Sequence, residues 1–172
     1  MSVKKILTEP NKLLRQVSKS VQKVGDDERV LMDHMLDTMY DAPGIGLAAI
    51  QIGVPKRIIV MDISRDENKK EPRYFVNPVI KNKDKEKAKY EEGCLSVPDQ
   101  FAEIERPNTC EVEYLDYNGK KQILKADGLL ATCIQHEIDH LEGVLFIDYL
   151  SKLKKSMIIK KLSKKNINRE IL

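Results

Sequence analysis

Apolar side chains recur at helical spacing along residues 26–40, where the pattern predicts an amphipathic helix. The side chains expected on its buried face are Val30, Leu31, Met35, Leu36 and Met39. Asp26 and Asp27 are suited to cap the start of this helix, and Pro43 with Gly44 to stop it.

Strands are predicted where apolar and β-branched residues cluster without helical spacing. Residues 57–63 and 74–80 form two such stretches, with a polar loop at 64–72 between them and an exposed connection expected at 81–89. Apolar and acidic residues then alternate from Cys110, and Asn118-Gly119 predicts a hairpin closed by a type I′ turn. Because strands precede a late helical portion, we expect an α+β fold with antiparallel β-sheets around a central buried helix.

The central helix is predicted over residues 128–142, with Asp127 at its start and Gly143 at its end. One face would carry Leu129, Cys133, His136 and His140. A second face would carry Leu130, Ile134, Ile138 and Leu141. A helix with two such faces is mostly buried, and burying two histidines is costly unless they have a function.

Composition fits one globular domain over residues 1–172, with 41% apolar and 33% charged residues. No run approaches the ~18 apolar residues that a membrane span needs, and no secretory leader is visible. Three cysteines are an odd number for a disulfide framework, which favours a reducing compartment. A cytoplasmic location is therefore expected, with no membrane or DNA partner.

Basic residues are concentrated in residues 151–172, which hold eight Lys or Arg against one acid, in a chain of net charge +3. Apolar residues recur among them at roughly helical spacing, at Leu150, Leu153, Met157, Ile158, Leu162 and Ile167. This C-terminal helix could simply pack on the domain as a solvated amphipathic helix. Alternatively its charge could dock the protein on ribosomal RNA. A membrane surface is disfavoured because the segment has no Trp or Phe.

His136-Glu137-Ile138-Asp139-His140 matches H-E-x-x-H, a pattern typical of metal sites on helices. Residues four apart are neighbours on a helix, so both imidazoles can reach one ion with Glu137 beside it. The ion lowers the pKa of a bound water to about 7, and Glu137 can take up and pass on its proton.

A catalytic metal site needs a third protein ligand and one open position. Residues 141–172 contain no histidine, and Glu142 lies off the ligand face of the helix. Cys94, in the upstream segment 91–98, is the best candidate, and its thiolate suits Fe(II) or Zn(II). Taken alone, Cys94 would be interpreted as a buried packing residue, but beside an incomplete H-E-x-x-H it is favoured as the third ligand.

The segment 44–51, Gly-Ile-Gly-Leu-Ala-Ala-Ile-Gln, combines small residues with an amide side chain. Its two glycines fit close approach of the backbone to a ligand, and Gln51 offers a hydrogen-bond donor. Without a following G-K-[ST] it is a poor phosphate loop. On its own the segment would be a turn that leads into a strand.

Three motifs occur in one order: G-I-G-L-A-A-x-Q at 44–51, E-G-C-L-S at 92–96 and Q-H-E-x-D-H at 135–140. In this combination the chain resembles the peptide deformylases, enzymes that remove the N-formyl group from new bacterial and organellar polypeptides. The resemblance extends from Ile6 to Gly143.

The resemblance implies a role for each motif residue. Cys94, His136 and His140 would hold the metal, generally Fe(II), with Zn(II), Ni(II) or Co(II) able to replace it. Glu137 would act as general base and acid. Gln51 and the backbone N–H of Leu95 would stabilise the oxyanion formed when hydroxide attacks the formyl carbon, with formate as a product.

The same resemblance implies how an N-formyl-Met peptide binds. An extended peptide would pair with backbone groups of Ile45, Gly46, Gly93 and Leu95. The methionine side chain would enter an apolar pocket, and Leu129 and Cys133 lie on the same helix stripe as the ligands. The chain departs from many relatives at Phe101, where Arg is frequent, and at Ile50, where Thr is frequent.

Two other function classes remain open from the residues themselves. A general zincin-type endopeptidase would also use H-E-x-x-H, although the missing downstream ligand argues against it. A non-catalytic ribosome-binding protein would need only the basic C-terminal segment, whereas here the metal ligands and Glu137 are all intact.

Overall fold

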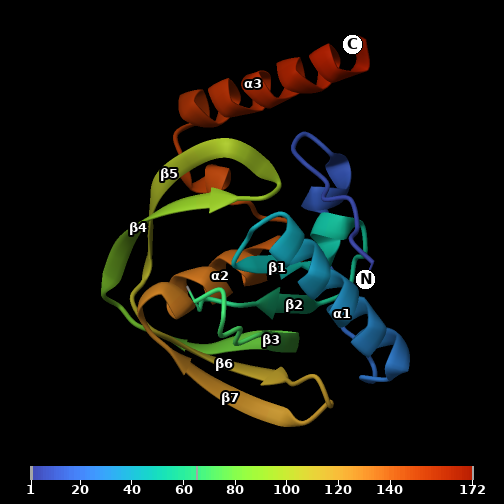
Figure 1. Cartoon of the computed structure of the whole chain (residues 1–172). Coiled ribbons are helices and arrows are strands. Elements are labelled where there is room, and N and C mark those ends of the chain that lie inside the picture. Colours follow the sequence, from blue (N-terminus) through green and yellow to red (C-terminus); the bar gives the residue numbers. More distant parts are fainter. Residues whose placement is uncertain (1, 65, 172) are drawn as a thin grey trace.

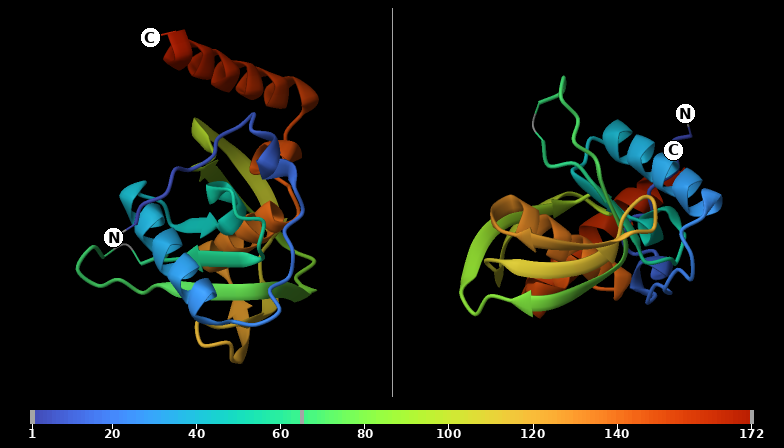
Figure 2. Two further views of the ribbon diagram at one scale, coloured as in Figure 1. Left: turned by 90° about the vertical axis from the view of Figure 1, so that its right-hand side faces the viewer. Right: turned by 90° about the horizontal axis from the view of Figure 1, so that it is seen from below.

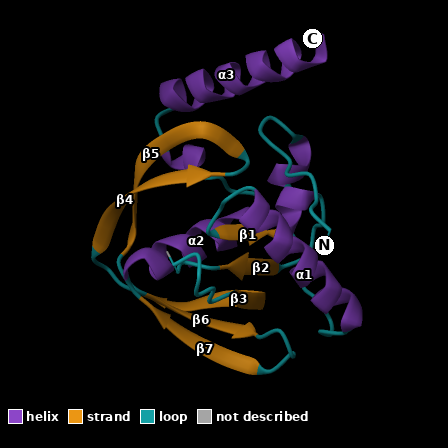
Figure 3. Ribbon diagram, in the orientation of Figure 1, coloured by secondary structure: helices purple, strands orange, loops and turns teal. Residues whose placement is uncertain are grey.

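The computed structural model describes residues 2–64 and 66–171, and side chains of the C-terminal helix up to Lys164. Its helices are α1 (Asp26–Asp41), α2 (Gly128–Leu141) and α3 (Lys152–Ile171), with short 3₁₀ helices at Lys12–Arg15, Ala49–Ile52 and Phe146–Tyr149. Its strands are β1 (Gly46–Ala48), β2 (Ile58–Met61), β3 (Arg73–Lys83), β4 (Lys87–Cys94), β5 (Val97–Pro107), β6 (Cys110–Leu115) and β7 (Lys121–Ala126) (Figures 1 and 3).

Five strands form an antiparallel sheet in the order β1-β2-β3-β6-β7, and β4 pairs with β5 in a separate two-stranded sheet. The larger sheet carries α1 on one face and α2 on the other. Strand β2 is apolar throughout because both of its faces are covered. Ile58 and Val60 belong to the apolar cluster beneath α1, whereas Ile59 and Met61 belong to the cluster beneath α2. Successive side chains of a strand point to opposite faces, so a strand covered on both sides must be continuously apolar.

Helix α2 lies between the two sheets, with contacts to both β1 and β5 (Figure 1). Ten of its 14 residues are buried, so the H-E-x-x-H residues sit in the interior rather than on the surface. The predicted fold class, α+β with antiparallel sheets around a central buried helix and a C-terminal helix, is confirmed.

The cap of helix α1 lies one residue before the predicted aspartate caps, and the helix itself begins at Asp26. Gly25 occupies the cap position, and its N–H donates to Glu28 Oε2 at 3.0 Å, while Asp26 and Asp27 fall in the first turn. Carboxylates there still favour the helix, because they face the positive end of its dipole. The predicted buried face was wrong at Val30, which is 50% exposed. Its place is taken by Met32, which shares a stripe with Met35 and Met39.

The two strand predictions were right in position, but 57–63 was too long and 74–80 too short. Residues 81–89 are largely exposed as expected, but they are not a connection, because β3 and β4 extend into them and leave only residues 84–86 as a turn. The β4–β5 hairpin was not predicted, since charged residues alternate along both of its strands. The turn between β6 and β7 is not type I′, because Gly119 has φ +80° whereas Asn118 is not among the described residues with positive φ.

The 3₁₀ helix at Phe146–Tyr149 leads into α3. Leu162 of α3 is buried, and Ile158 packs against the same apolar cluster as Val97 of β5. Leu153 and Met157 remain exposed, and the side chain of Ile167 lies outside the described residues. Beyond these contacts α3 projects from one end of the molecule (Figure 2). Among the described residues, no helix is long and apolar enough to cross a membrane.

Helix α2 ends at Leu141, and Gly143 terminates it as predicted, because Gly143 has φ +73° and its N–H donates to the carbonyl of His140 at 3.1 Å. A Cβ on Gly143 would also collide with the backbone carbonyl of Arg15. The end of α2 is thus packed directly on the backbone of the N-terminal segment at Arg15.

We predict that Gly143→Ala destabilises the protein by about 2–4 kcal/mol, from left-handed strain plus the backbone collision. Gly53→Ala is the matched control, because Gly53 has φ +83° but a Cβ there would find its nearest atom, in Leu7, at 3.9 Å. This control should cost only about 1–2 kcal/mol. Urea unfolding of both variants tests the difference, and equal losses would contradict the packing argument.

Candidate metal centre

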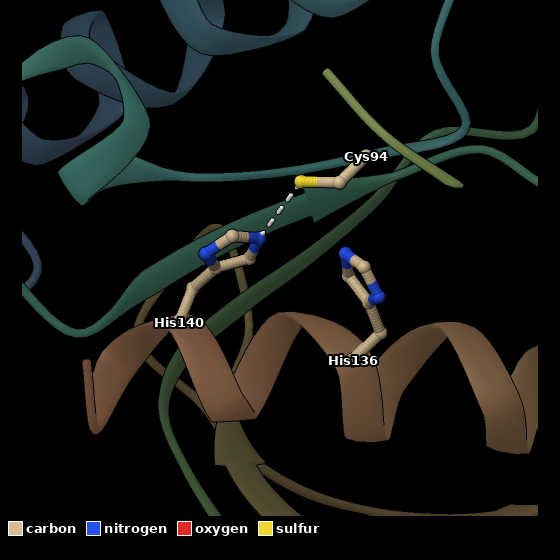
Figure 4. A group of neighbouring side chains, drawn as sticks. All are labelled: Cys94, His136 and His140. Carbon is tan, nitrogen blue, oxygen red and sulfur yellow. Dashed lines mark hydrogen bonds between the residues drawn. The ribbon is translucent and has the colours of Figure 1, made fainter. Parts of the chain in front are cut away.

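Three potential metal ligands meet above the buried face of α2. His136 and His140 extend from successive turns of the helix, and Cys94 reaches them from the end of β4 (Figure 4). One ligand atom from each of the three lies within 4.8 Å of the others, and Cys94 Sγ is 3.3 Å from His140 Nε2. The structure therefore brings together the predicted pair and the upstream cysteine, which is 42 positions before His136 in the sequence.

The chemistry of these donors fits a divalent transition metal. One thiolate and two imidazoles suit Fe(II), Zn(II) and similar ions, and three protein ligands leave a position open. Burial lowers the pKa of His140 well below its usual value. The imidazole of His140 is therefore held neutral, which is the form that binds a metal.

His136 is oriented by a buried acid. Its Nδ1 lies 2.8 Å from Glu92 Oε1, and because a carboxylate only accepts, Nδ1 must carry the proton. Burial alone would raise the pKa of Glu92, but hydrogen bonds from His136 and Arg106 bring it below its usual value. An ionised Glu92 thus leaves Nε2 of His136 as the available ligand atom.

Arg106 neutralises this buried acid. Its guanidinium makes two hydrogen bonds to Glu92, Nε to Oε2 at 2.7 Å and Nη2 to Oε1 at 3.0 Å, and a third to Asp139 at 2.8 Å. The Tyr149 hydroxyl donates to the same oxygen of Asp139 at 2.7 Å. Sequence reasoning assigned no role to Glu92, Arg106 or Asp139. For Glu92 the sequence did offer a signal. Glu92 lies two residues before Cys94 on one strand, and residues so spaced share a face.

Glu137 points its carboxylate at the backbone of β1. A Cβ on Gly46 would lie 2.7 Å from Glu137 Oε1, so only glycine allows this approach. Burial raises the pKa of Glu137 to about 7; His136 opposes this rise, whereas the charge of Glu92 adds to it. Among the described residues Glu137 Oε2 has no hydrogen-bond partner. A buried carboxyl that titrates near neutrality suits a group that takes up and releases a proton.

Gln51 is held in one orientation by its neighbours. Its Oε1 accepts from the Ala48 N–H at 2.9 Å, and its Nε2 donates to Ser96 Oγ at 3.0 Å. The Nε2 atom also lies 3.6 Å from Cys94 Sγ, so the amide group faces the proposed ligands. Ser96, another residue without a predicted role, is fully buried and also donates its N–H to Cys94 Sγ at 3.4 Å.

A cavity of about 610 Å³ opens beside these residues. Its lining includes the predicted site residues Ile45, Gly46, Gln51, Gly93, Cys94, Leu95, Leu129, Cys133, His136 and Glu137. His140 is not part of that lining and lies 1% exposed behind it. Burial raises the pKa of the Cys133 thiol well above its usual value, so this cysteine is an uncharged part of the wall.

Comparison with known proteins identifies the family. The model of the polypeptide deformylase family matches residues 3–156. A peptide deformylase of Pelagibacter ubique is 87% identical over all 172 residues of both chains. The chain belongs to the peptide deformylase family. Another deformylase, from Hyphomonas neptunium, is 60% identical over 97% of this chain and 96% of its own.

Solved structures agree with this membership. The crystal structure of a peptide deformylase from Ehrlichia chaffeensis superposes with a TM-score of 0.91 at 46% identity, covering 96% of this chain and 97% of that one. A second structure from the same organism, in complex with actinonin, has a TM-score of 0.90 at 49% identity and covers 96% and 98%.

The protein is therefore an enzyme, a metal-dependent hydrolase that removes the N-formyl group from the initiator methionine of new polypeptides and releases formate. Of the three function classes considered from the residues, deformylation is the one that the family supports.

We predict that Glu92→Gln lowers metal affinity roughly 10- to 100-fold, because His136 loses the ionised acceptor that fixes its tautomer. Glu103→Gln is the matched control, since Glu103 lies on the adjoining strand β5, is exposed, and has its Oε1 3.9 Å from Lys89 Nζ. Competition with a chromogenic chelator measures both affinities. Equal affinity in Glu92→Gln and the parent would show that the Glu92 contact does not support the metal.

Proposed function

We propose that Cys94, His136 and His140 hold one divalent ion per chain, Fe(II) in the native enzyme, with Zn(II), Ni(II) or Co(II) able to replace it. The observation that carries this proposal is the convergence of one sulfur and two imidazole atoms within 4.8 Å beside an open cavity. When bound, such an ion supplies a Lewis acid that lowers the pKa of a coordinated water to about 7.

Glu137 is the proton carrier of the reaction. Its carboxyl is next to His136 in sequence, is buried, and has a pKa of about 7, so it can exist in either protonation state at neutral pH. It takes the proton of the attacking water and passes it to the amine nitrogen that leaves. The close approach to Gly46 holds the carboxyl at the side of the cavity where the peptide would bind.

Two hydrogen-bond donors stabilise the charge that develops on the formyl oxygen. Gln51 presents Nε2 from a side chain already fixed by Ala48 and Ser96, so little reorganisation is needed during the reaction. The backbone N–H of Leu95 follows the ligand Cys94 directly, and Leu95 lines the cavity. The Leu95 side chain is packed so closely on Gly44 that a Cβ there would lie 2.6 Å from it.

The peptide binds in an extended conformation between two strand edges. β1 is an outer strand of the five-stranded sheet, and β4 has β5 as its partner in a two-stranded sheet, so each offers an edge for strand addition. Ile45 and Gly46 would pair on one side and Gly93 and Leu95 on the other. The methionine side chain would then enter the part of the cavity lined by Leu129 and Cys133.

The whole chain, residues 1–172, would act as one catalytic domain in the cytoplasm, where formylated polypeptides are made. The three free thiols are consistent with a reducing compartment.

We predict that Glu137→Gln lowers kcat for formate release roughly 10²- to 10⁴-fold, because the amide cannot accept a proton. Formyl-Met peptides and anaerobically purified, Fe(II)-loaded protein are used for the assay. Metal analysis of the same samples serves as the control, and equal metal content would assign the loss to proton transfer.

Unformylated peptides of the same sequence provide the contrary test. Cleavage of their internal bonds by the parent enzyme would favour a zincin-type endopeptidase instead. An active Glu137→Gln enzyme would remove Glu137 from the mechanism.

We also propose that α3 places the active site near emerging chains by contact with ribosomal RNA. Among the side chains that the structure describes, most lysines of α3 are exposed, whereas Lys155 is half-buried and pairs with Asp148 at 2.7 Å. The apolar contact of α3 with the domain is made through Ile158 and Leu162. Phosphate contacts of this kind supply affinity that falls steeply with salt.

Replacing four exposed lysines of α3 by Gln should weaken ribosome co-sedimentation at low salt. The replaced residues are Lys154, Lys160, Lys161 and Lys164. A control with the same change of charge uses exposed lysines at the end of β3, in the β3–β4 turn and at the start of β4, namely Lys83, Lys85, Lys87 and Lys89. Equal co-sedimentation of both variants would contradict a specific role for α3.

A further inference from the structure

Phe101 of β5 is a large aromatic side chain at the rim of the cavity, yet it is 66% exposed. Its ring lies across the backbone of Gly93, where a Cβ would come within 2.6 Å of the ring. The ring is therefore placed by the hairpin and held on one side, while its other surfaces face solvent and the cavity.

The two faces of the β4–β5 hairpin differ in what they offer a peptide. Glu92 and Cys94 point inward, toward His136 and His140 of α2. The Cβ direction of Gly93 points the other way, to Phe101, as alternation along a strand requires. Register supports the same division, because Glu91 is paired with Glu103 and both are exposed.

An extended peptide on the edge of β4 must follow this division. Under the proposed function, the formyl-methionine side chain points inward, to Leu129 and Cys133. The side chain of the second residue then points outward, because successive side chains of a strand alternate. Residues paired across neighbouring strands share a face, so this second side chain lies beside Gly93 and meets the ring of Phe101.

We propose that Phe101 is a specificity-determining residue, which selects substrates whose second residue, directly after formyl-methionine, is aromatic or aliphatic. This proposal rests on the proposed binding mode and adds a substrate preference to it. Binding is stabilised when an apolar side chain covers an exposed ring, and a pair of aromatic rings is stabilised by more than its buried area alone provides.

Charge at the rim strengthens the discrimination. The carboxylate of Glu91 lines the same cavity as Phe101, and the described lining contains no lysine or arginine. An acidic second residue would therefore meet an apolar ring and a carboxylate of its own sign. It would gain no favourable partner there, and like charges at such a distance repel.

The test compares formyl-Met-Xaa-Ala peptides with an amidated C-terminus, in which Xaa is Phe, Leu, Ser or Asp. Formate release gives kcat/KM for each with the metal-loaded, full-length enzyme. We expect Phe and Leu to exceed Ser by roughly fivefold and Asp by tenfold or more, from one side-chain contact on an aromatic ring. Phe101→Ala should reduce the Phe-to-Ser ratio to below about twofold, whereas Phe101→Leu, which keeps an apolar surface, should retain most of it.

Ile123→Ala is the matched control, because Ile123 is 60% exposed on the distant edge strand β7. Its Phe-to-Ser ratio should equal that of the parent. Equal kcat/KM for all four peptides in the parent, or an unchanged ratio in Phe101→Ala, would overturn the role of Phe101 and leave deformylation intact. No formate from any peptide would overturn the proposed function together with this inference.

Discussion

The burial of α2 between two sheets is the constraint on which the rest of the structure depends. A helix covered on both sides carries its ionisable residues into a medium where an unpaired charge is unstable. The structure meets this demand with partners: Glu92 orients His136, and Arg106 offsets the charge of Glu92. His140 is instead kept neutral by its surroundings. The same burial brings the pKa of Glu137 near 7, so the property that makes the helix costly to bury also makes it suitable for proton transfer.

The β4–β5 hairpin supplies the side chains that complete the site on α2. One strand, β4, contributes the orienting acid Glu92 and the thiol of Cys94 two residues later on the same face. Gly93 lies between them and has no Cβ, so the ring of Phe101 can pack against its backbone on the outer face. Alternation along β4 thus places the proposed ligand Cys94 and the acid Glu92 on one face, and the surface that a peptide would touch beyond its first residue on the other. Small residues of the 44–51 segment complete the site by letting Glu137 and Leu95 approach the backbone of β1 and its preceding turn.

Local patterns predicted the elements whose partners lie nearby in the chain. The spacing of His136, Glu137 and His140 was sufficient to predict that they lie together, because residues four apart on a helix are neighbours. The termination of α2 by Gly143 and the apolar strand β2 were also predicted, since each is a short-range signal. Predictions failed where tertiary contacts outweigh the local pattern. Val30 is exposed and Met32 is buried because packing on the sheet determines which side of α1 faces the core. The β4–β5 hairpin was not predicted because charged residues alternate along its strands.

The sequence by itself determined an α+β fold with two histidines and a glutamate on a buried helix, because motif spacing and periodicity are properties of the chain alone. The activity was indicated by the resemblance of its three motifs to the peptide deformylases, the family to which the chain belongs. Only the tertiary structure decided how that site is supported. The contacts of Arg106 with Glu92 and Asp139, of Ser96 with Gln51, and of Phe101 with Gly93 join residues on different elements or across a hairpin. Their distances follow from how sheets and helix pack together, and no spacing along the chain encodes that packing.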